Sequence, residues 1–101
     1  MTVSDHALLD RWVDYRGAEA FAELVSRHSA MVFNTCLRVI GNSADAQELT
    51  QEGFARLVNG VPRGKQLWPS LGGWLHTVAT RRALDWRKGQ ARRHRRETEY
   101  A

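Results

Sequence analysis

The segment Asp45-Ala-Gln-Glu-Leu-Thr-Gln-Glu-Gly-Phe54 is followed, across a loop that contains Pro and Gly, by Trp74-Leu-His-Thr-Val-Ala-Thr-Arg-Arg-Ala-Leu-Asp85. Both segments repeat their apolar residues at steps of three and four, which is typical of helices with one buried side. The first carries acidic and amide side chains opposite its apolar side, and the second opens a helix that becomes strongly basic. This order indicates an all-α domain with one surface for a polyanion and another surface for a different partner.

The whole chain is expected to form four helices, because no run of alternating β-branched residues is bounded by turn signals. The helices are predicted over residues 4–16, 18–40, 43–60 and 71–96. Polar N-caps precede three of them, namely Ser4 or Asp5, Asn42 or Ser43, and Ser70. The predicted stops are Gly17, Gly41, and Asn59-Gly60 followed by Pro62. Past Arg87 the last helix holds almost no apolar residue, so we expect that end to project or fray.

The helix over residues 18–40 is expected to be the central core helix, because its apolar periodicity is the clearest in the chain. Its stripe consists of Phe21, Leu24, Val25, His28, Val32, Cys36, Val39 and Ile40. The other helices carry shorter apolar lines. These are Leu8, Leu9, Trp12 and Val13 in the first helix; Ala46, Leu49, Gly53, Phe54 and Leu57 in the third; and Leu71, Trp74, Leu75, Val78, Ala79 and Trp86 in the fourth.

Length and composition indicate a single packed domain. The chain has 101 residues, of which 43% are hydrophobic, and it contains four Trp. Residues 1–60 hold eight acidic and five basic residues, whereas residues 61–101 hold ten basic and three acidic residues, a local net charge of +7. The basic end is therefore the part expected to meet a polyanion.

Several classes of protein are disfavoured by the sequence. No apolar run approaches the length of a membrane span, and the N-terminus has no secretory signal, so we expect a cytoplasmic protein without a membrane partner. Cys36 is the single cysteine, which excludes an intramolecular disulfide. The four histidines are dispersed, and no zinc spacing, phosphate-binding loop or nucleophile–base pair stands out. We therefore expect no metal, no cofactor, no catalytic residue and no enzymatic activity.

The two quoted segments resemble region 2 of bacterial sigma factors, in particular the extracytoplasmic-function group of the sigma-70 family. The family pattern Ala-Glu-Asp-x-x-Gln-Glu-x-Phe is matched by Ala46-Gln47-Glu48-Leu49-Thr50-Gln51-Glu52-Gly53-Phe54. The run Trp-Leu-x-x-Ile-Ala-x-Asn-x-x-x-Asp is matched by Trp74-Leu75, Val78-Ala79 and Asp85. Arg81 stands where the family has Asn, and Gln47 replaces one family acid.

This resemblance implies two binding surfaces. The helix over residues 43–60 would dock on the clamp-helix coiled coil of the largest catalytic subunit of core RNA polymerase, through Asp45, Gln47, Glu48, Gln51 and Glu52. The loop over residues 61–70 and the basic helix would bind promoter DNA as the single-stranded non-template strand of the −10 element, through Arg63, Lys65, Gln66, Trp68, Arg81, Arg82, Arg87 and Lys88. In the family this loop captures a base flipped from that strand. Residues 97–101 would form a tail.

Some alternatives stay open at this point. Trp68 either covers the core or contacts an unpaired base, and Trp74 is more typical of a core residue than of a stacking one. The chain also fits a general basic nucleic-acid-binding module, or a protein that sequesters polymerase or an anti-sigma factor without initiating transcription. An anti-sigma factor is a further partner that the resemblance allows. Family members carry a second domain that reads the −35 element, so the chain is expected to be an excised domain, a gene fragment or a standalone region 2.

Overall fold

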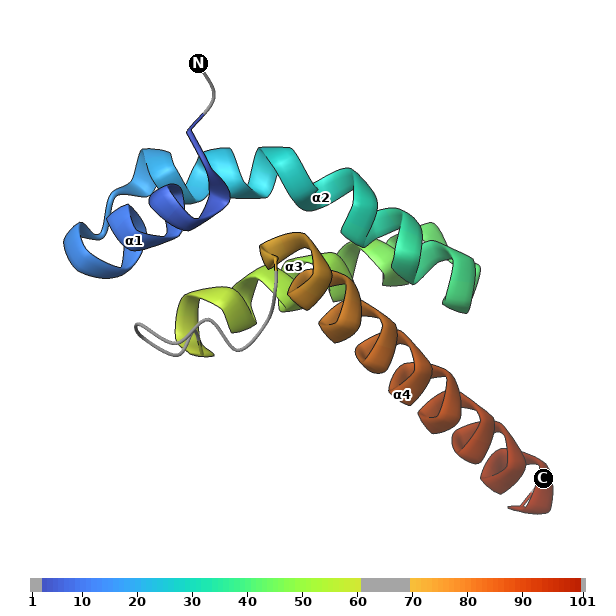
Figure 1. Cartoon of the computed structure of the whole chain (residues 1–101). Coiled ribbons are helices and arrows are strands. Elements are labelled where there is room, and N and C mark those ends of the chain that lie inside the picture. The colour runs from blue at the N-terminus through green and yellow to red at the C-terminus, as the bar shows by residue number, and fades with distance from the viewer. Residues whose placement is uncertain (1–2, 61–69, 101) are drawn as a thin grey trace.

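A computed structural model describes residues 3–60 and 70–100 of the chain. These residues form four α-helices and no strand: α1 (Asp5–Tyr15), α2 (Ala18–Ile40), α3 (Ser43–Gly60) and α4 (Leu71–Tyr100). Figure 1 shows α1 beside one end of α2 and α3 running below α2, while α4 starts next to α2 and α3 and extends away from them. The predicted all-α fold is confirmed.

Polar side chains cap three of the helices, as the sequence predicts. Ser4 Oγ accepts the Ala7 N–H at 3.1 Å before α1, and Ser70 Oγ accepts the Gly73 N–H at 2.9 Å before α4. Of the two candidates before α3, Asn42 is the cap, because its Oδ1 accepts the Asp45 N–H at 3.0 Å. Each cap satisfies one of the amide groups that a helix N-terminus leaves without a partner.

The junction between α1 and α2 differs from the prediction. Arg16, not Gly17, takes the left-handed conformation, with φ of 52°, and its N–H donates to the carbonyl of Trp12. Gly17 has φ of −71° because it already serves as the N-cap of α2, so the left-handed residue must come one position earlier. The guanidinium of Arg16 lies 5.2 Å from the Trp12 ring centroid, a cation–π contact that offsets part of this backbone cost. At the other end of α2, Gly41 is left-handed as expected, with φ of 75°.

The core lies where α2 meets the other three helices, so the predicted central position of α2 is confirmed. The fully buried side chains of large volume come from α2, α3 and α4, namely Leu24, Val32, Cys36, Leu57, Leu71 and Leu75. Burying one Leu completely stabilises the fold by roughly 1.5–3 kcal/mol, so these residues dominate the favourable free energy. Leu8 and Leu9 attach α1 to this core.

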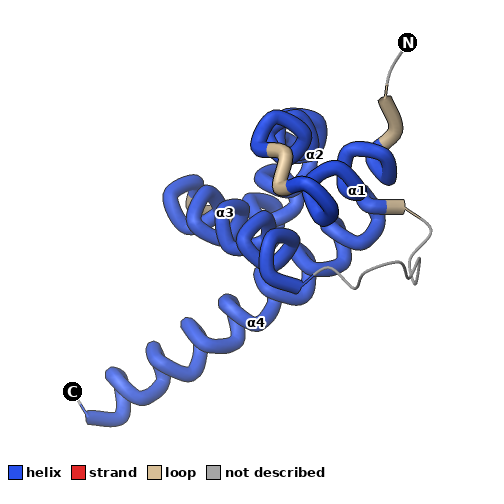
Figure 2. Tube along the Cα trace, turned by 90° about the vertical axis from the view of Figure 1, so that its left-hand side faces the viewer, coloured by secondary structure: helices blue, strands red, loops and turns tan. Residues whose placement is uncertain are grey.

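Helix α4 has a packed first half and a projecting second half. Its buried residues are Leu71, Leu75, Ala79 and Ala83, whereas every residue from 91 to 99 is exposed. Figures 1 and 2 both show the second half extending away from the other helices, and the molecule measures 57 × 23 × 22 Å. The helix continues past the expected end at Arg96 to Tyr100, because no Pro or Gly interrupts it there and Thr98 Oγ1 donates to the His94 carbonyl. The predicted tail is therefore helical as far as Tyr100.

None of the described helices combines the length and the apolar content that crossing a bilayer requires.

Candidate functional site

The polar side of α3 is presented to solvent by the packing of its opposite side. Ala46, Leu49 and Leu57 are buried, whereas the side chains of Gln47, Glu48 and Gln51 are exposed. Asp45, in the first turn, is half-buried, and its carboxylate lies near the positive end of the helix dipole. All five residues predicted on this surface, Glu52 included, are thus accessible or partly accessible. We call Gln47, Glu48 and Gln51 the α3 polar face.

Glu52, the fifth predicted residue, has a different environment. Few basic residues lie within four positions of it, so the local sequence predicts an unpaired carboxylate, and this prediction is wrong. Arg82 of α4 donates from Nε to Glu52 Oε2 at 2.5 Å and from Nη2 to Oε1 at 3.3 Å. The hydrogen bond that Arg82 donates to Glu52 is the main reason why the pKa of Arg82 is raised above its ordinary value. The partner is thirty residues away in the sequence, and local spacing does not identify such a tertiary contact.

The basic residues of α4 are arranged as a stripe. Arg81, Lys88, Arg92 and Arg95 follow one another at intervals of seven, four and three residues, so they lie along one side of the helix, and all four are exposed. Arg87, also predicted to bind DNA, is exposed outside this stripe, and Arg82 is half-buried beside α3. We call the first four residues the α4 basic stripe. Four exposed positive charges along one side of a helix create a positive surface potential that attracts anions.

The predicted loop residues Arg63, Lys65, Gln66 and Trp68 lie outside the described residues. Trp74, at the start of α4, is half-buried against the core, in line with the core interpretation. It also lines a hollow of about 270 Å³ together with Arg56, Asn59 and Val78. Neither Arg56 nor Asn59 was predicted as a site residue. The sequence indicated Asn59 only as part of the Asn-Gly pair that ends the helix.

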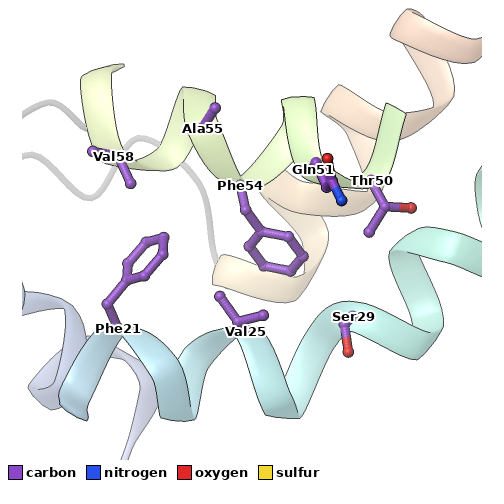
Figure 3. A pocket seen from close by; sticks show the side chains of 8 residues that line it. All are labelled: Phe21, Val25, Ser29, Thr50, Gln51, Phe54, Ala55 and Val58. Carbon is purple, nitrogen blue, oxygen red and sulfur yellow. The ribbon is translucent and has the colours of Figure 1, made fainter. Parts of the chain in front are cut away.

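An apolar groove of about 340 Å³ runs beside the α3 polar face. Figure 3 shows Phe21 and Val25 of α2 facing Phe54 and Val58 of α3 across it, with Gln51 at its border. The sequence placed Phe21 and Val25 in the core, whereas both are only half-buried. Sequence periodicity identifies the apolar side of a helix but not which part of that side a neighbour leaves uncovered.

One histidine, His28, takes part in a polar cluster between α1 and α2. His28, expected on the apolar stripe of α2, is half-buried with its Nε2 at 2.8 Å from Asp5 Oδ2, and Arg27 donates to Asp5 Oδ1 at 3.0 Å. Among the residues that the structure describes, no group of three or more His, Cys, Asp or Glu side chains could hold a metal ion. The Asp5, Arg27 and His28 cluster instead connects α1 to α2.

A family model and a curated relative both connect the chain to the same protein family. A family model described as Sigma-70 region 2 matches residues 24–93. The chain is 34% identical over 88 residues to the ECF RNA polymerase sigma factor SigE of Mycolicibacterium smegmatis, an alignment that covers 85% of this chain and 34% of that protein. The chain thus spans about a third of the length of this curated relative. No solved structure matches the chain. The family match shows that the chain belongs to the sigma-70 region 2 family, whose members are transcription-initiation factors and not enzymes, and the curated relative is a factor of the extracytoplasmic-function group.

Proposed function

We propose that this domain docks on core RNA polymerase through α3, and that the segment before α4 together with α4 recognises and opens the promoter −10 element. Such a factor acts in the cytoplasm. The observation that carries the proposal is the separation of two surfaces of opposite character on neighbouring helices. The α3 polar face offers an acid and two amides, and the α4 basic stripe offers four positive charges. The name of the M. smegmatis relative, an RNA polymerase sigma factor, supports the same assignment.

The docking surface on α3 suits a helical partner with basic and polar side chains, such as the clamp-helix coiled coil. Glu48 lies at the centre of the exposed side of α3, and Gln47 and Gln51 supply both donors and acceptors. The apolar groove next to Gln51 adds surface that an aliphatic side chain of the partner can fill. A polar rim beside an apolar area is the usual composition of a protein–protein interface.

Promoter opening requires binding energy and no bond chemistry. Phosphate contacts of the α4 basic stripe supply affinity for a single strand, while stacking and base contacts offset the few kcal/mol that flipping a base costs. The exposed Arg81, which stands at the position of the family Asn, adds a charge at the start of this stripe. A guanidinium at that position can pair with a phosphate or stack on a base.

The substitution Glu48→Lys tests the docking proposal. It should weaken binding to core polymerase by about tenfold or more, because it reverses a charge at the centre of the α3 polar face. The free energy of unfolding should change by less than about 0.5 kcal/mol, since Glu48 is exposed. Affinity is measured by surface-immobilised binding, and stability by thermal unfolding.

Asp14→Lys is the matched control. It makes the same change of charge at an exposed residue in the last turn of α1, where a positive charge suits the helix dipole. This variant should bind polymerase as the wild type does. Equal polymerase affinity for wild type, Glu48→Lys and Asp14→Lys would exclude α3 as the docking helix. Single-strand binding without any polymerase affinity would instead favour a general nucleic-acid-binding module.

A further inference from the structure

The ion pair between Glu52 and Arg82 connects the two helices to which the proposed function assigns different partners. Two nitrogens of the Arg82 guanidinium donate to the two carboxylate oxygens of Glu52, at 2.5 and 3.3 Å. This is the bidentate arrangement that planar guanidinium and carboxylate groups favour. The side chains of Arg82 and Glu52 are 31% and 43% exposed, so both remain within reach of a partner at the surface.

The pair changes what each residue can do in the free domain. Arg82 follows the exposed Arg81 in the basic run, but its Nε and Nη2 donors are directed at Glu52 and not at solvent. A phosphate that used the same edge of the guanidinium would have to displace the carboxylate. Glu52, in turn, offers no free carboxylate to a polymerase side chain while Arg82 holds it.

The surroundings of the pair favour this closed arrangement. The hydrogen bond and charge of Glu52, with a smaller contribution from the charge of Asp85, raise the pKa of Arg82, so the guanidinium stays charged. Both side chains arise from helices that pack on the same core, beside buried Gly53 on α3 and Ala83 on α4. Their backbones are therefore held in place, and only the side chains need to move for the pair to open.

We propose that the Glu52–Arg82 pair is a latch that keeps Arg82 away from DNA in the free domain and releases it when α3 engages polymerase. The inference depends on the proposed function, since it couples the two surfaces named there. A partner that binds Glu52 removes the carboxylate from Arg82, and a phosphate that binds Arg82 frees Glu52. By linkage, each partner then strengthens the binding of the other by the same factor. Because the pair is partly exposed, that factor should be about two- to fivefold.

A double-mutant cycle on the free domain tests the masking of Arg82. The probe is a fluorescent ten-nucleotide single strand, and the variants are Glu52→Gln, Arg82→Gln and the double variant. Glu52→Gln should bind the strand about two- to fivefold more tightly than the wild type. The slope of log K against log salt should also become steeper by about 0.7, the amount expected for one added single-strand phosphate contact. Arg82→Gln should have little effect in the wild-type background and should abolish the gain in the Glu52→Gln background.

Two further variants separate the latch from other effects. Glu48→Gln removes a charge from the same helix at a residue that forms no ion pair among the described residues, so its effect should be the same with Arg82 or Gln at position 82. Arg82→Lys keeps the charge but cannot form the bidentate contact, so this variant should bind the strand at least as tightly as the wild type. Thermal unfolding of each variant confirms that the domains compared are folded.

The release of Arg82 is tested on the complex with core polymerase. Arg82→Gln should weaken binding of the same single strand about two- to fivefold in the complex while changing it little in the free domain. Strictly additive effects of Glu52→Gln and Arg82→Gln, with wild-type strand binding intact, would overturn the latch and leave the proposed function standing. An equal loss from Arg82→Gln in the free domain and in the complex would do the same. Absence of strand and polymerase binding by the wild-type domain would overturn both.

Discussion

Asp5 attaches α1 to α2 through polar contacts. One carboxylate oxygen accepts from Arg27, and the other lies 2.8 Å from the His28 ring. Burial alone, the largest single effect, would raise the pKa of Asp5, but the hydrogen bonds from Arg27 and His28 together with their charges outweigh it, so the pKa is lowered from 3.8. The His28 ring also lies 3.6 Å from the position that a Cβ on Gly72 would occupy, so this cluster adjoins the first turn of α4.

The lowered pKa of Asp5 predicts a specific dependence of stability on pH. A carboxyl whose pKa is lower in the folded than in the unfolded state stabilises the fold above its ordinary value of 3.8, and that contribution is lost as the pH falls through the folded pKa. The free energy of unfolding of the wild type should therefore drop over this acid range, and Asp5→Asn should lack that part of the drop. Chemical denaturation at a series of pH values measures it. Exposed Asp14→Asn is the control, and identical pH profiles for the two variants would contradict the assignment.

Cys36 predicts how the core responds to thiol reagents. Its side chain is fully buried on α2, and burial raises the pKa of the thiol, so the reactive thiolate is scarce in the folded domain. Labelling with a thiol reagent at neutral pH should therefore be slow and should accelerate in parallel with unfolding as denaturant is added. Mass spectrometry follows the modified fraction. Rapid labelling well below the unfolding midpoint would show that the core around Cys36 opens locally.

The two halves of helix α4 have different roles, one in packing and one in carrying charge. The half that begins at Leu71 packs on α2 and α3 and fixes the direction of the helix, while the half beyond Trp86 contributes charge and little buried surface. Because the second half projects from the body of the domain, it can reach phosphates at some distance from the segment before α4 (Figure 2).

Truncation after Lys88 tests this division of α4. It removes Arg92, Arg93, Arg95 and Arg96, all of which are exposed, so the free energy of unfolding should stay nearly unchanged. For the whole domain, log K for a single strand should fall with log salt at a slope of roughly −3 to −4, and each phosphate contact that is lost should reduce that slope by about 0.7. The truncated domain should therefore bind with a clearly shallower slope. Fluorescence anisotropy at several salt concentrations measures it, and an unchanged slope would place the phosphate contacts elsewhere.

Local sequence patterns predict some features of the whole molecule and not others. The four helices, three of their N-caps and most of the core follow from apolar periodicity and from single residues such as Ser4, Gly41 and Ser70. The pairing of Glu52 with Arg82 does not, because it depends on the angle at which α3 and α4 pack. The open groove beside Phe21 is also a tertiary feature, since its walls come from two different helices, α2 and α3. Local rules thus predict the elements and their chemical character, while contacts between elements decide which charges remain free.

The connection between the two surfaces is the segment that carries Arg63, Lys65, Gln66 and Trp68, and it is the part of the chain where we predict base recognition. In the sequence it joins the end of α3 to the start of α4, the two helix ends from which Asn59 and Trp74 line a hollow. A basic, aromatic segment of this kind suits unpaired bases, because stacking does not depend on a duplex groove. The domain should therefore bind a single-stranded −10 non-template strand more tightly than the same sequence as duplex.

Trp68→Ala tests whether the ring stacks on a base. If it does, the substitution should cost about 1–3 kcal/mol of single-strand binding while the melting temperature changes little. If Trp68 covers the core, the melting temperature falls first and affinity falls only as the folded fraction declines. Trp12→Ala provides the comparison for a structural tryptophan, because Trp12 packs on Phe21 with ring centroids 5.0 Å apart, on the α1 side of the domain. That variant should lose stability and keep its strand affinity at temperatures where it is folded. Equal affinity for duplex and single strand, with Trp68→Ala behaving like Trp12→Ala, would refute capture of a flipped base by this segment.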